Sequence, residues 1–519
     1  MKPAPPSAQL LQRLRWIAPG AILALAAVLR LWALGRPDSL VFDELYYVRD
    51  AVTQLVYGYP TGWPDDDPAF GGERARAFLD QASTIAHPPL GKWLIGLGIL
   101  ALGPDSGWGW RIAVALAGVA TVAVTMRIGY LVGRSIWVAC FAGLLLALDG
   151  VHIVLSRVSL LDGFLTLFVA LGALFVVRDW LASGARWGTR AEPGILWCRP
   201  WLLTAGLAFG AAAAVKWSGL YPLAAFLVLL TMGDLLRRLG SARLVRHADR
   251  PAPARRPGWR ALGDGVLQAL VTAAIALPAA FAAYLASWIG WIVTPAGSGR
   301  VEGEAWWVSL WRWHADSLAW HSTLSAPHPY QSNPWSWPLG LRPTAMYSAR
   351  SGDYISTISP LPNPIVTWLG VAALLLLVWV VVRSAALAAR TRRLAPLRSR
   401  AVTVSAFVLT GYLAGWVPWL LLSSRPAVFQ FYAVVLTPFA AIALALVLAS
   451  FASLPRSEFV LRGAGVRLSG SFEARQGRGI SVALVLATAL LLALLFWPLW
   501  IGMPIKDWFY GLHRWLPGW

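Results

Sequence analysis

Runs of about 20 mostly apolar residues recur along almost the whole chain, and they restrict its fold more than any other feature. An α-helix needs a run of this length to cross the hydrocarbon core of a bilayer. Of the 519 residues, 58% are hydrophobic and only 13% are charged, whereas about 25% of the residues of a soluble domain are charged. The chain has too few charges to cover a soluble protein of this size. It is therefore predicted to be an all-α polytopic membrane protein.

Eleven of these apolar runs predict transmembrane helices. The first follows a basic N-terminal stretch and has no small-residue cleavage site after it, so it is interpreted as an uncleaved helix. A further apolar stretch at 88–102 is only about 15 residues long, which suits an interfacial or re-entrant helix better than a span. The expected spans lie near 16–35, 110–131, 136–155, 159–178, 201–216, 218–236, 266–293, 364–383, 402–423, 428–451 and 480–501.

Basic and acidic residues are distributed unequally between alternate loops. Loop 237–262 contains eight Arg and loop 383–400 contains six Arg and no acid, whereas residues 36–88 contain nine acids and four Arg. The positive-inside rule therefore places the N-terminus in the cytoplasm and the large first and fourth external loops, 36–109 and 294–363, outside the cell membrane. The net charge of +20 lies mostly in short loops between apolar runs, so it does not indicate nucleic-acid binding. Both external loops are too long for simple turns, and we expect the function there.

Ionisable side chains gather at the external ends of the predicted spans. Such residues are costly in or near a bilayer and indicate a functional site. Snorkelling to the interface explains one or two of them, but it explains the whole set poorly. We therefore expect a polar cavity at the extracytoplasmic end of the helices. The set consists of Arg111, Asp149, His152, Arg157, Asp162, Lys216 and Arg425.

The segment VFDELYYVRDA, residues 41–51, places two adjacent carboxylates just after the first span. On a helix, Asp43 and Glu44 point about 100° apart, so different roles are expected for them. A carboxylate at a membrane surface can act as a general base toward a hydroxyl or can ligate a metal. An acidic first helical turn, favoured by the helix dipole, is an equally good interpretation of the residues alone.

The segment HPPLGKW, residues 87–93, contains a second group of reactive side chains. Its prolines fix an extended backbone, and Gly91 permits close approach. His87 and Lys92 could bind a phosphate or a sugar hydroxyl, or the segment could be a rigid turn with Lys92 at the interface. The chain has only four lysines, and Lys92 and Lys216 both lie in the expected site. They are candidates for specific point charges, with chance placement as the alternative.

The external hairpin at 148–164 is expected to bring four ionisable side chains close together, either to bind a ligand or as buried Arg/Asp pairing. They are Asp149, His152, Arg157 and Asp162. Cations beside an acid suit a donor whose phosphate is attached to a lipid. The candidates for binding the phosphate and sugar of a donor are His87, Lys92, Arg111, Arg157, Asp162, Lys216 and Arg425.

Clustered Trp, Tyr and His side chains in loop 294–363, and the segment SSRPAVFQFY at 423–432, suggest a surface for sugars or for an acceptor. An aromatic belt at the membrane interface is the alternative, and both interpretations can hold together. The candidates for these contacts are His328, Tyr330, Trp335, Trp337, Gln430 and Tyr432.

Metal ligands are not clearly indicated. Asp65, Asp66 and Asp67 stand between two prolines, and a solvated turn is the favoured interpretation. The two cysteines have no zinc-binding spacing. We therefore expect no firm metal site and no firm cofactor, and a divalent cation is left open.

These segments together resemble the protein O-mannosyltransferase family in its actinobacterial form. The resemblance covers nearly the whole chain and depends on the combination and order of its motifs. The motifs are FDELYY after the first span, HPPLGKW ahead of WRIAVALAG, LLLALDGVHIVLSRVSLLD, AAAVKWSGLYPL and SAPHPYQSNPWSWPLGLRP.

The resemblance implies a single GT-C transmembrane domain over residues 1–519, with the catalytic acid in the first external loop. It implies transfer of mannose from a polyprenyl-phosphate donor to Ser or Thr hydroxyls of exported, unfolded polypeptides. The Asp-Glu pair of the family corresponds to Asp43 and Glu44, its HPP motif to residues 87–89, and the arginine that opens the second span to Arg111. Loop 294–363 is too short for the MIR domain of eukaryotic relatives, which leaves acceptor selection by such a domain in doubt.

On this basis we expect Asp43 to deprotonate the acceptor hydroxyl while the polyprenyl phosphate leaves with inversion at the anomeric carbon. Arg111, Lys216 and Arg425 would stabilise the leaving phosphate, and Glu44 and His87 would orient the acceptor or the donor. Contact with the protein-export machinery is a further expectation.

Two other functions compete with this interpretation. A related GT-C enzyme could use the same donor on a lipid or a cell-wall glycan, which the full motif set disfavours. A transporter or flippase would place its polar groups near the midplane and would show internal repeats. The polar residues of this chain gather at one face, and no repeat is visible in the sequence.

Overall fold

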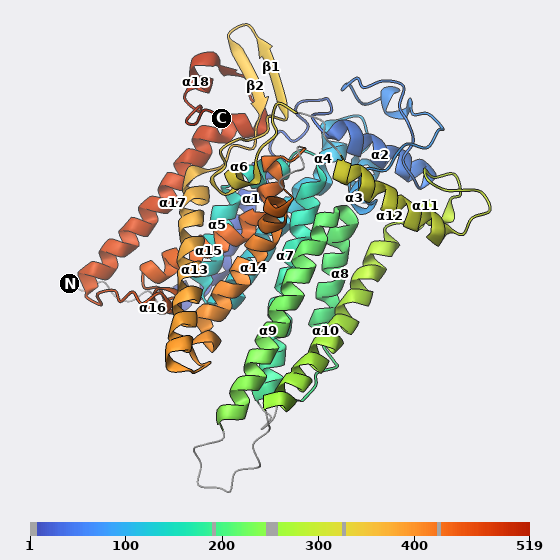
Figure 1. Ribbon diagram of the computed structural model, residues 1–519. Helices are drawn as coiled ribbons and strands as arrows, with labels where there is room; N and C mark the ends of the chain where they lie inside the picture. Colours follow the sequence, from blue (N-terminus) through green and yellow to red (C-terminus); the bar gives the residue numbers. More distant parts are fainter. Residues whose placement is uncertain (1–7, 189–193, 245–257, 324–327, 423–426) are drawn as a thin grey trace.

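The computed structural model describes residues 8–188, 194–244, 258–323, 328–422 and 427–519, and long helices dominate it (Figure 1). Each of the eleven predicted spans overlaps at least one helix. Eight of the described helices are long and apolar enough to cross a membrane, whereas the described apolar parts of α1, α5 and α8 are shorter, so the count of eleven is not confirmed. The helices are α1 Ala8–Leu31, α4 Gly107–Gly133, α5 Ile136–Ala147, α7 Leu161–Gly188, α8 Pro200–Val215, α9 Leu220–Leu244, α10 Gly258–Ala286, α13 Pro364–Thr391, α14 Arg400–Leu421, α15 Thr437–Phe451 and α17 Phe472–Ile501.

The predicted single span at 136–155 is wrong, because the helix breaks inside it. α5 ends at Ala147, and Asp149 then caps a separate short helix, α6 Gly150–Leu155, by accepting a hydrogen bond from the His152 backbone N–H at 3.0 Å. A polar cap competes with helix continuation, which apolar periodicity alone does not reveal. A Cβ atom at Gly150 would lie 2.1 Å from the Leu361 carbonyl oxygen, so the break also allows close backbone packing.

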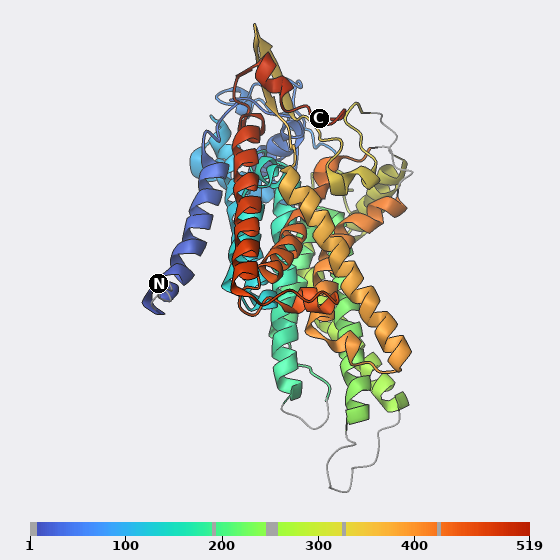
Figure 2. The ribbon, with the colours of Figure 1, turned by 90° about the vertical axis from the view of Figure 1, so that its left-hand side faces the viewer.

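Short elements cover one end of the long helices. In both views α2, α3, α11 and α12 lie across this end, and a β-hairpin projects beyond them (Figures 1 and 2). The sheet is antiparallel in the order β1-β2-β3. The helix predicted at 88–102 is α3. The short elements are α2 Glu44–Tyr57, η1 Arg74–Arg76, α3 Leu90–Leu102, α11 Ile289–Val293, α12 Trp306–Thr323, η3 Pro334–Leu339, β1 Tyr347–Ser351, β2 Tyr354–Ile358, η4 Pro396–Arg398, α16 Phe459–Gly463, β3 Ile505–Lys506 and α18 Asp507–Gly511.

Small residues on α8 allow it to pack tightly between α7 and α10. A Cβ atom at Gly206 would lie 2.5 Å from the Ala276 carbonyl oxygen, and one at Gly210 would lie 2.2 Å from that of Ala280. Close contact through small residues is typical of helix packing in membranes, where apolar burial gives little preference between helix and lipid. The C-terminal end of α8 is thereby fixed beside α7, and Lys216 directly follows this end.

Candidate active site

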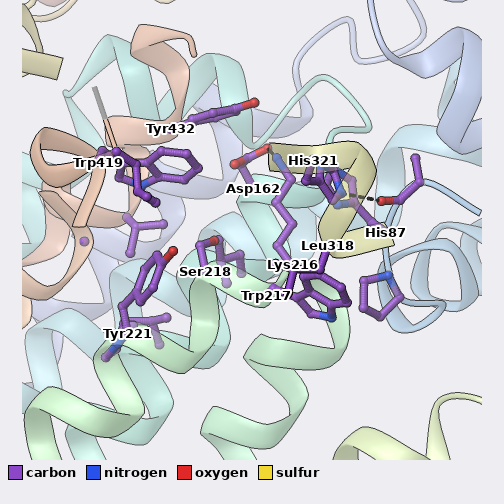
Figure 3. Close-up of a pocket in the computed structure, with 18 of the residues that line it drawn as sticks. His87, Asp162, Lys216, Trp217, Ser218, Tyr221, Leu318, His321, Trp419 and Tyr432 are labelled. Atoms are coloured by element: carbon purple, nitrogen blue, oxygen red, sulfur yellow. Dashed lines mark hydrogen bonds and ion pairs between the residues drawn. The ribbon is translucent and has the colours of Figure 1, made fainter. Parts of the chain in front are cut away.

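A cavity of about 310 Å³ opens at the covered end of the helices. Its wall combines the start of α7, the turn η2 Trp217–Gly219 with the start of α9, the outer part of α14, the 3₁₀ segment η5 Gln430–Leu436, and α12. Figure 3 shows Lys216 and Asp162 near its centre, with the two histidines toward one side and Trp419 and Tyr221 toward the other. Its labelled polar and aromatic side chains are His87, Asp162, Lys216, Trp217, Ser218, Tyr221, His321, Trp419 and Tyr432.

Lys216 enters the cavity because the chain becomes extended directly after α8. Its backbone has φ −147° and ψ 140°, and the Nζ atom lies 2.7 Å from Oδ2 of Asp162 in the first turn of α7. Nζ also lies 4.7 Å from the ring centroid of Tyr432, which is within the range of a cation–π contact. An ammonium group has three donors, and among the described residues Asp162 is the hydrogen-bond acceptor of Lys216 Nζ. The remaining donors are suited to an anion in the cavity.

Asp43 is not one of the lining side chains of this cavity, but it lies near enough to the lining residues Lys216 and Asp162 for their charges to act on its carboxyl group. It is half-buried at the N-terminal end of α2, and the Tyr47 hydroxyl donates to its Oδ2 atom at 3.4 Å. Burial raises the pKa of Asp43 to about 6; the Lys216 ammonium opposes the shift and the Asp162 carboxylate adds to it. Phe42, the residue before it, has φ +50°, a strained conformation for a bulky side chain and one that is common at functional sites.

Glu44 does not lie at the cavity, although it is adjacent to Asp43. It is fully buried and forms a bidentate pair with Arg111, with Nε–Oε1 and Nη2–Oε2 distances of 2.8 and 2.7 Å. Its carboxylate also accepts hydrogen bonds from the backbone N–H groups of Val41 and Ser159. These four bonds use the accepting capacity of a carboxylate. The expectation of a catalytic Glu44 therefore disagrees with this geometry, and Glu44 is placed to fix the backbone around Asp43.

Arg111 and Arg157 also disagree with the expectation that they bind the donor. Besides Glu44, the Arg111 guanidinium donates to the carbonyl oxygens of Leu34, Pro37 and Ser39. Arg157 is buried and donates to three carbonyl oxygens around the C-terminal end of α1, with the shortest distance, 2.9 Å, to that of Arg30. A helix end leaves carbonyl groups without partners, so both arginines complete the backbone hydrogen bonding instead of facing a ligand.

Lys92 likewise does not line the cavity, although its Nζ atom lies 3.4 Å from the carbonyl oxygen of His87. Its side chain is fully buried, and its Nζ atom lies 2.9 Å from Oδ2 of Asp50 on α2. The lysine therefore links α3 to α2, and the prediction that it binds the donor is not supported. Arg425 lies outside the described residues, so its predicted role stays a prediction.

Two histidines from distant segments meet at the cavity. The ring of His87 is nearly parallel to that of His321, with centroids 5.6 Å apart, and it lies 6.1 Å from the ring of Tyr47. His321 comes from α12 and was missed at the sequence level, because the long loop gives no indication of which of its histidines folds back. Trp217 was also missed as a site residue, although it directly follows Lys216. His87 lines the cavity, and its predicted role in binding or orienting a substrate stays a prediction.

The predicted acceptor and sugar contacts lie in different environments. Tyr432 lines the cavity, and the buried Trp337 packs edge-on against it at 6.0 Å. Gln430 is buried, and its Oε1 atom accepts a hydrogen bond from the Arg342 backbone N–H at 2.7 Å, so a structural role fits it better. Trp335 is 67% exposed. The remaining candidates, His328 and Tyr330, lie outside this cavity.

The three consecutive aspartates form a turn that Arg49 holds. Its guanidinium donates to the carbonyl oxygens of Asp65 and Asp67 at 2.7 and 2.8 Å, and the Asp66 side chain is 91% exposed. This agrees with the predicted solvated turn. Across the described ranges, no group of three or more His, Cys, Asp or Glu side chains is arranged to hold a metal ion.

Comparisons with known proteins agree along the whole chain. Residues 70–289 match the family described as dolichyl-phosphate-mannose-protein mannosyltransferase, and residues 306–519 match the C-terminal four-helix region of protein O-mannosyltransferase. The polyprenol-phosphate-mannose–protein mannosyltransferase of Mycobacterium tuberculosis H37Rv is 31% identical over 98% of this chain and 93% of its own. The enzyme of the same name from Mycolicibacterium smegmatis is 30% identical over 97% and 93%.

A solved structure shows the same arrangement of helices. The Saccharomyces cerevisiae Pmt1-Pmt2 protein O-mannosyltransferase complex bound to its sugar donor superposes with a TM-score of 0.70, covering 99% of this chain and 94% of the compared chain at 15% identity. The predicted GT-C fold is therefore confirmed.

Proposed function

Because the chain belongs to the dolichyl-phosphate-mannose-protein mannosyltransferase family, we propose that Asp43 is the base with which it mannosylates proteins. The protein is a multi-pass membrane glycosyltransferase that transfers mannose from a polyprenyl-phosphate-mannose donor to a protein acceptor. One observation carries the assignment of the base. Of the two adjacent acids, Asp43 is the one that structural hydrogen bonds do not saturate, whereas Glu44 is fully paired.

The proposed step is a direct displacement at the anomeric carbon. A Ser or Thr hydroxyl gives its proton to the Asp43 carboxylate while its oxygen forms a bond to C1 of mannose. The bond between C1 and the phosphate oxygen breaks, and polyprenyl phosphate leaves with the electron pair from the opposite face. Configuration at C1 is therefore inverted. The raised pKa of Asp43, about 6, makes it a better proton acceptor than an ordinary aspartate while it stays ionised near neutral pH.

Lys216 supplies the positive charge for the leaving phosphate in this proposal. Negative charge on the phosphate grows as the C1–O bond breaks, and a fixed ammonium in a partly dehydrated cavity stabilises it. Asp162 holds the ammonium at 2.7 Å, and the Tyr432 ring limits its movement. The step as proposed requires no divalent cation, because the donor has a single phosphate and Lys216 provides the opposing charge.

The lipid chain of the donor fits the apolar part of the same cavity. Leu165 and Val169 of α7, Pro222 of α9, and Gly415 and Leu422 at α14 line it. We place the first isoprene units between these three helices, because burial of each CH₂ group contributes about 0.8 kcal/mol.

Transfer of radiolabelled mannose tests the proposal directly. Membranes containing the protein receive radiolabelled polyprenyl-phosphate mannose and a peptide with one Thr. Asp43→Asn should lower the initial rate about 10²–10⁴-fold, the usual contribution of a general base. Asp66→Asn, in the same loop and highly exposed, is the matched control and should keep the wild-type rate. Near-wild-type turnover by Asp43→Asn would refute the base assignment, and label in lipid or glycan without peptide product would refute the Thr acceptor.

We further propose that the site faces the outside of the cell membrane and that the acceptors are exported polypeptides before they fold. The arginine-rich segments follow the ends of the long helices opposite to α2 and α12 (Figures 1 and 2), which the positive-inside rule assigns to the cytoplasm. A site at the membrane surface would meet a chain as it leaves the protein-export machinery. Reporter fusions after residue 244 and in loop 36–88 test the orientation: activity of a periplasmic reporter is expected only for the second.

A further inference from the structure

A second cavity, of about 300 Å³, lies beside the site and has no part in the chemistry described above. The segments that line it connect the long helices and belong to none of them. Polar side chains of His328, Gln331, Asn333 and Arg342 dominate its lining, whereas the first cavity extends along apolar helix faces. A polar cavity formed by connecting segments is suited to a ligand that arrives from water.

Arg342 gives this second cavity a positive charge. It is the one charged side chain among the described residues of the lining, apart from the titratable His328, and no carboxylate lines it. The Arg342 guanidinium donates to the Pro329 carbonyl oxygen at 2.8 Å, which leaves further N–H donors of its five. His328 accepts a hydrogen bond from the Tyr330 backbone N–H at Nδ1, so its neutral ring carries the proton on Nε2. The cavity therefore presents hydrogen-bond donors to an anionic or carbonyl-rich ligand.

Aromatic rings connect the second cavity to Asp43 and to the first cavity. The ring of Phe42 lies 6.2 Å from that of His328 and 5.6 Å from that of Phe431. Phe431 in turn lies 4.8 Å from Tyr432, which lines the first cavity. The rings of Phe42, Phe431 and Tyr432 form an aromatic wall between the two cavities. Asp43 directly follows Phe42, so the proposed base lies at the end of this wall. A hydroxyl from one cavity and an anomeric carbon from the other would meet beside it.

We propose that the second cavity binds the acceptor polypeptide and that Arg342 selects acceptors with an Asp or Glu within a few residues of the modified hydroxyl. This proposal rests on the proposed function and adds the acceptor class to it. An extended polypeptide offers carbonyl oxygens to the donors of His328, Gln331 and Asn333, and a carboxylate satisfies the remaining donors of Arg342. The phosphate of the donor belongs on the other side of the aromatic wall, at Lys216.

Matched peptide pairs test the preference. Thr peptides that differ only by Asp or Asn, placed two to five residues on either side of the Thr, are compared by kcat/KM. For an exposed ion pair we expect the best Asp peptide to exceed its Asn partner about twofold to fivefold, with a smaller ratio at high salt. Arg342→Glu should reverse the ratio and favour a Lys peptide over its Gln partner, and Arg342→Lys should keep part of the original preference.

Arg350→Gln is the matched control, since Arg350 lies on β1, pairs with Asp507 and lines neither cavity. It should keep the wild-type ratio. Equal kcat/KM for all peptide pairs, or an unchanged ratio in Arg342→Glu, would overturn the proposal. A raised KM for the donor with an unchanged peptide ratio would also overturn it, because Arg342 would then bind phosphate. Failure of the function itself is distinguishable, because wild type would then mannosylate none of the peptides.

Discussion

The two ends of the α7–α8 pair each contain an ion pair, yet the pairs are built differently. At the end away from the cavity, Arg199 contacts both oxygens of Asp179, with distances of 3.2 and 2.5 Å, and donates to Thr272 Oγ1 at 2.7 Å. At the cavity end, Lys216 contacts one oxygen of Asp162. Asp162 and Asp179 are 17 positions apart on one helix, or about 25 Å along its axis. Both ion pairs join α7 to an end of α8, so the packing of these two helices alone does not explain why the pairs differ.

The type of cation, arginine at one end and lysine at the other, explains the difference between the two ion pairs. A guanidinium has five donors in a rigid fork and suits a saturated, buried contact, whereas an ammonium is a compact charge with donors that can be shared with a ligand. The same contrast separates the neighbours Glu44 and Asp43, because one carboxylate is saturated by Arg111 and backbone groups and the other is not. In this protein, charged groups with unused hydrogen-bond donors or acceptors mark the proposed site. Charged groups whose donors or acceptors are all used belong to the structural frame that supports it.

Removing Arg199, the cation at the end away from the cavity, should have the largest effect, and this effect should be on the stability of the fold. Arg199→Met leaves Asp179 buried without its partner, which costs about 3–5 kcal/mol. We expect a clearly lower Tm and a lower yield of folded protein in detergent, with activity per folded molecule near that of wild type. The exposed Arg462, which pairs with Glu458 on the surface, provides the control: Arg462→Met should leave Tm almost unchanged. Loss of turnover without loss of Tm in Arg199→Met would erase the proposed distinction.

Removing the cation at the cavity end should affect turnover instead. Lys216→Met should lower kcat about 10²–10³-fold, the cost of losing one preorganised group that stabilises developing charge. Lys216→Arg restores the charge but in a planar group, and a partial recovery is expected. Initial rates with saturating donor measure both, and near-wild-type kcat in Lys216→Met would remove Lys216 from the proposed step.

The pH dependence should sharpen the contrast between the two adjacent acids. The pKa of Asp43 is raised to about 6, so the base is increasingly protonated below that pH. We expect kcat/KM to be constant above about pH 7 and to approach a tenfold fall per pH unit below about pH 6. The Tyr47 hydroxyl bond favours the ionised form, so Tyr47→Phe should move the midpoint to higher pH. A profile that stays flat down to pH 4.5 would contradict the assignment of Asp43.

Removal of divalent cations should have the smallest effect. If Lys216 supplies the charge at the leaving phosphate, EDTA should change the initial rate by less than about twofold, an effect no larger than that of a weak, solvent-exposed electrostatic contact. Restoration of a lost rate by Mg²⁺ or Mn²⁺ would show that a cation shares this role with Lys216. The assay is the same mannosyl-peptide assay with chelated and metal-supplemented membranes.

The sequence by itself determined the membrane class, the approximate positions of the helices, with several ends eight or more residues from the observed ones, and the segments in which chemistry is found. Long apolar runs and basic loops are local properties, and they depend only on the transfer of side chains between water and lipid. Asp43, His87, Asp162, Lys216 and Tyr432 were identified in this way. The break at Asp149 was missed because a single polar cap within an apolar run changes the periodicity too little to be noticed.

Only the tertiary structure decided which of the charged residues face the cavity. Arg111, Arg157 and Lys92 are cationic like Lys216 and also lie near the external ends of apolar runs, but the structure gives them partners away from the cavity: Glu44 and backbone carbonyl groups for the arginines, and Asp50 for Lys92. His321 lies beside His87 at the site, although the two residues are more than 230 positions apart in the sequence. Saturation of a donor or acceptor depends on groups that are distant in the chain, so no local pattern in the sequence can report it.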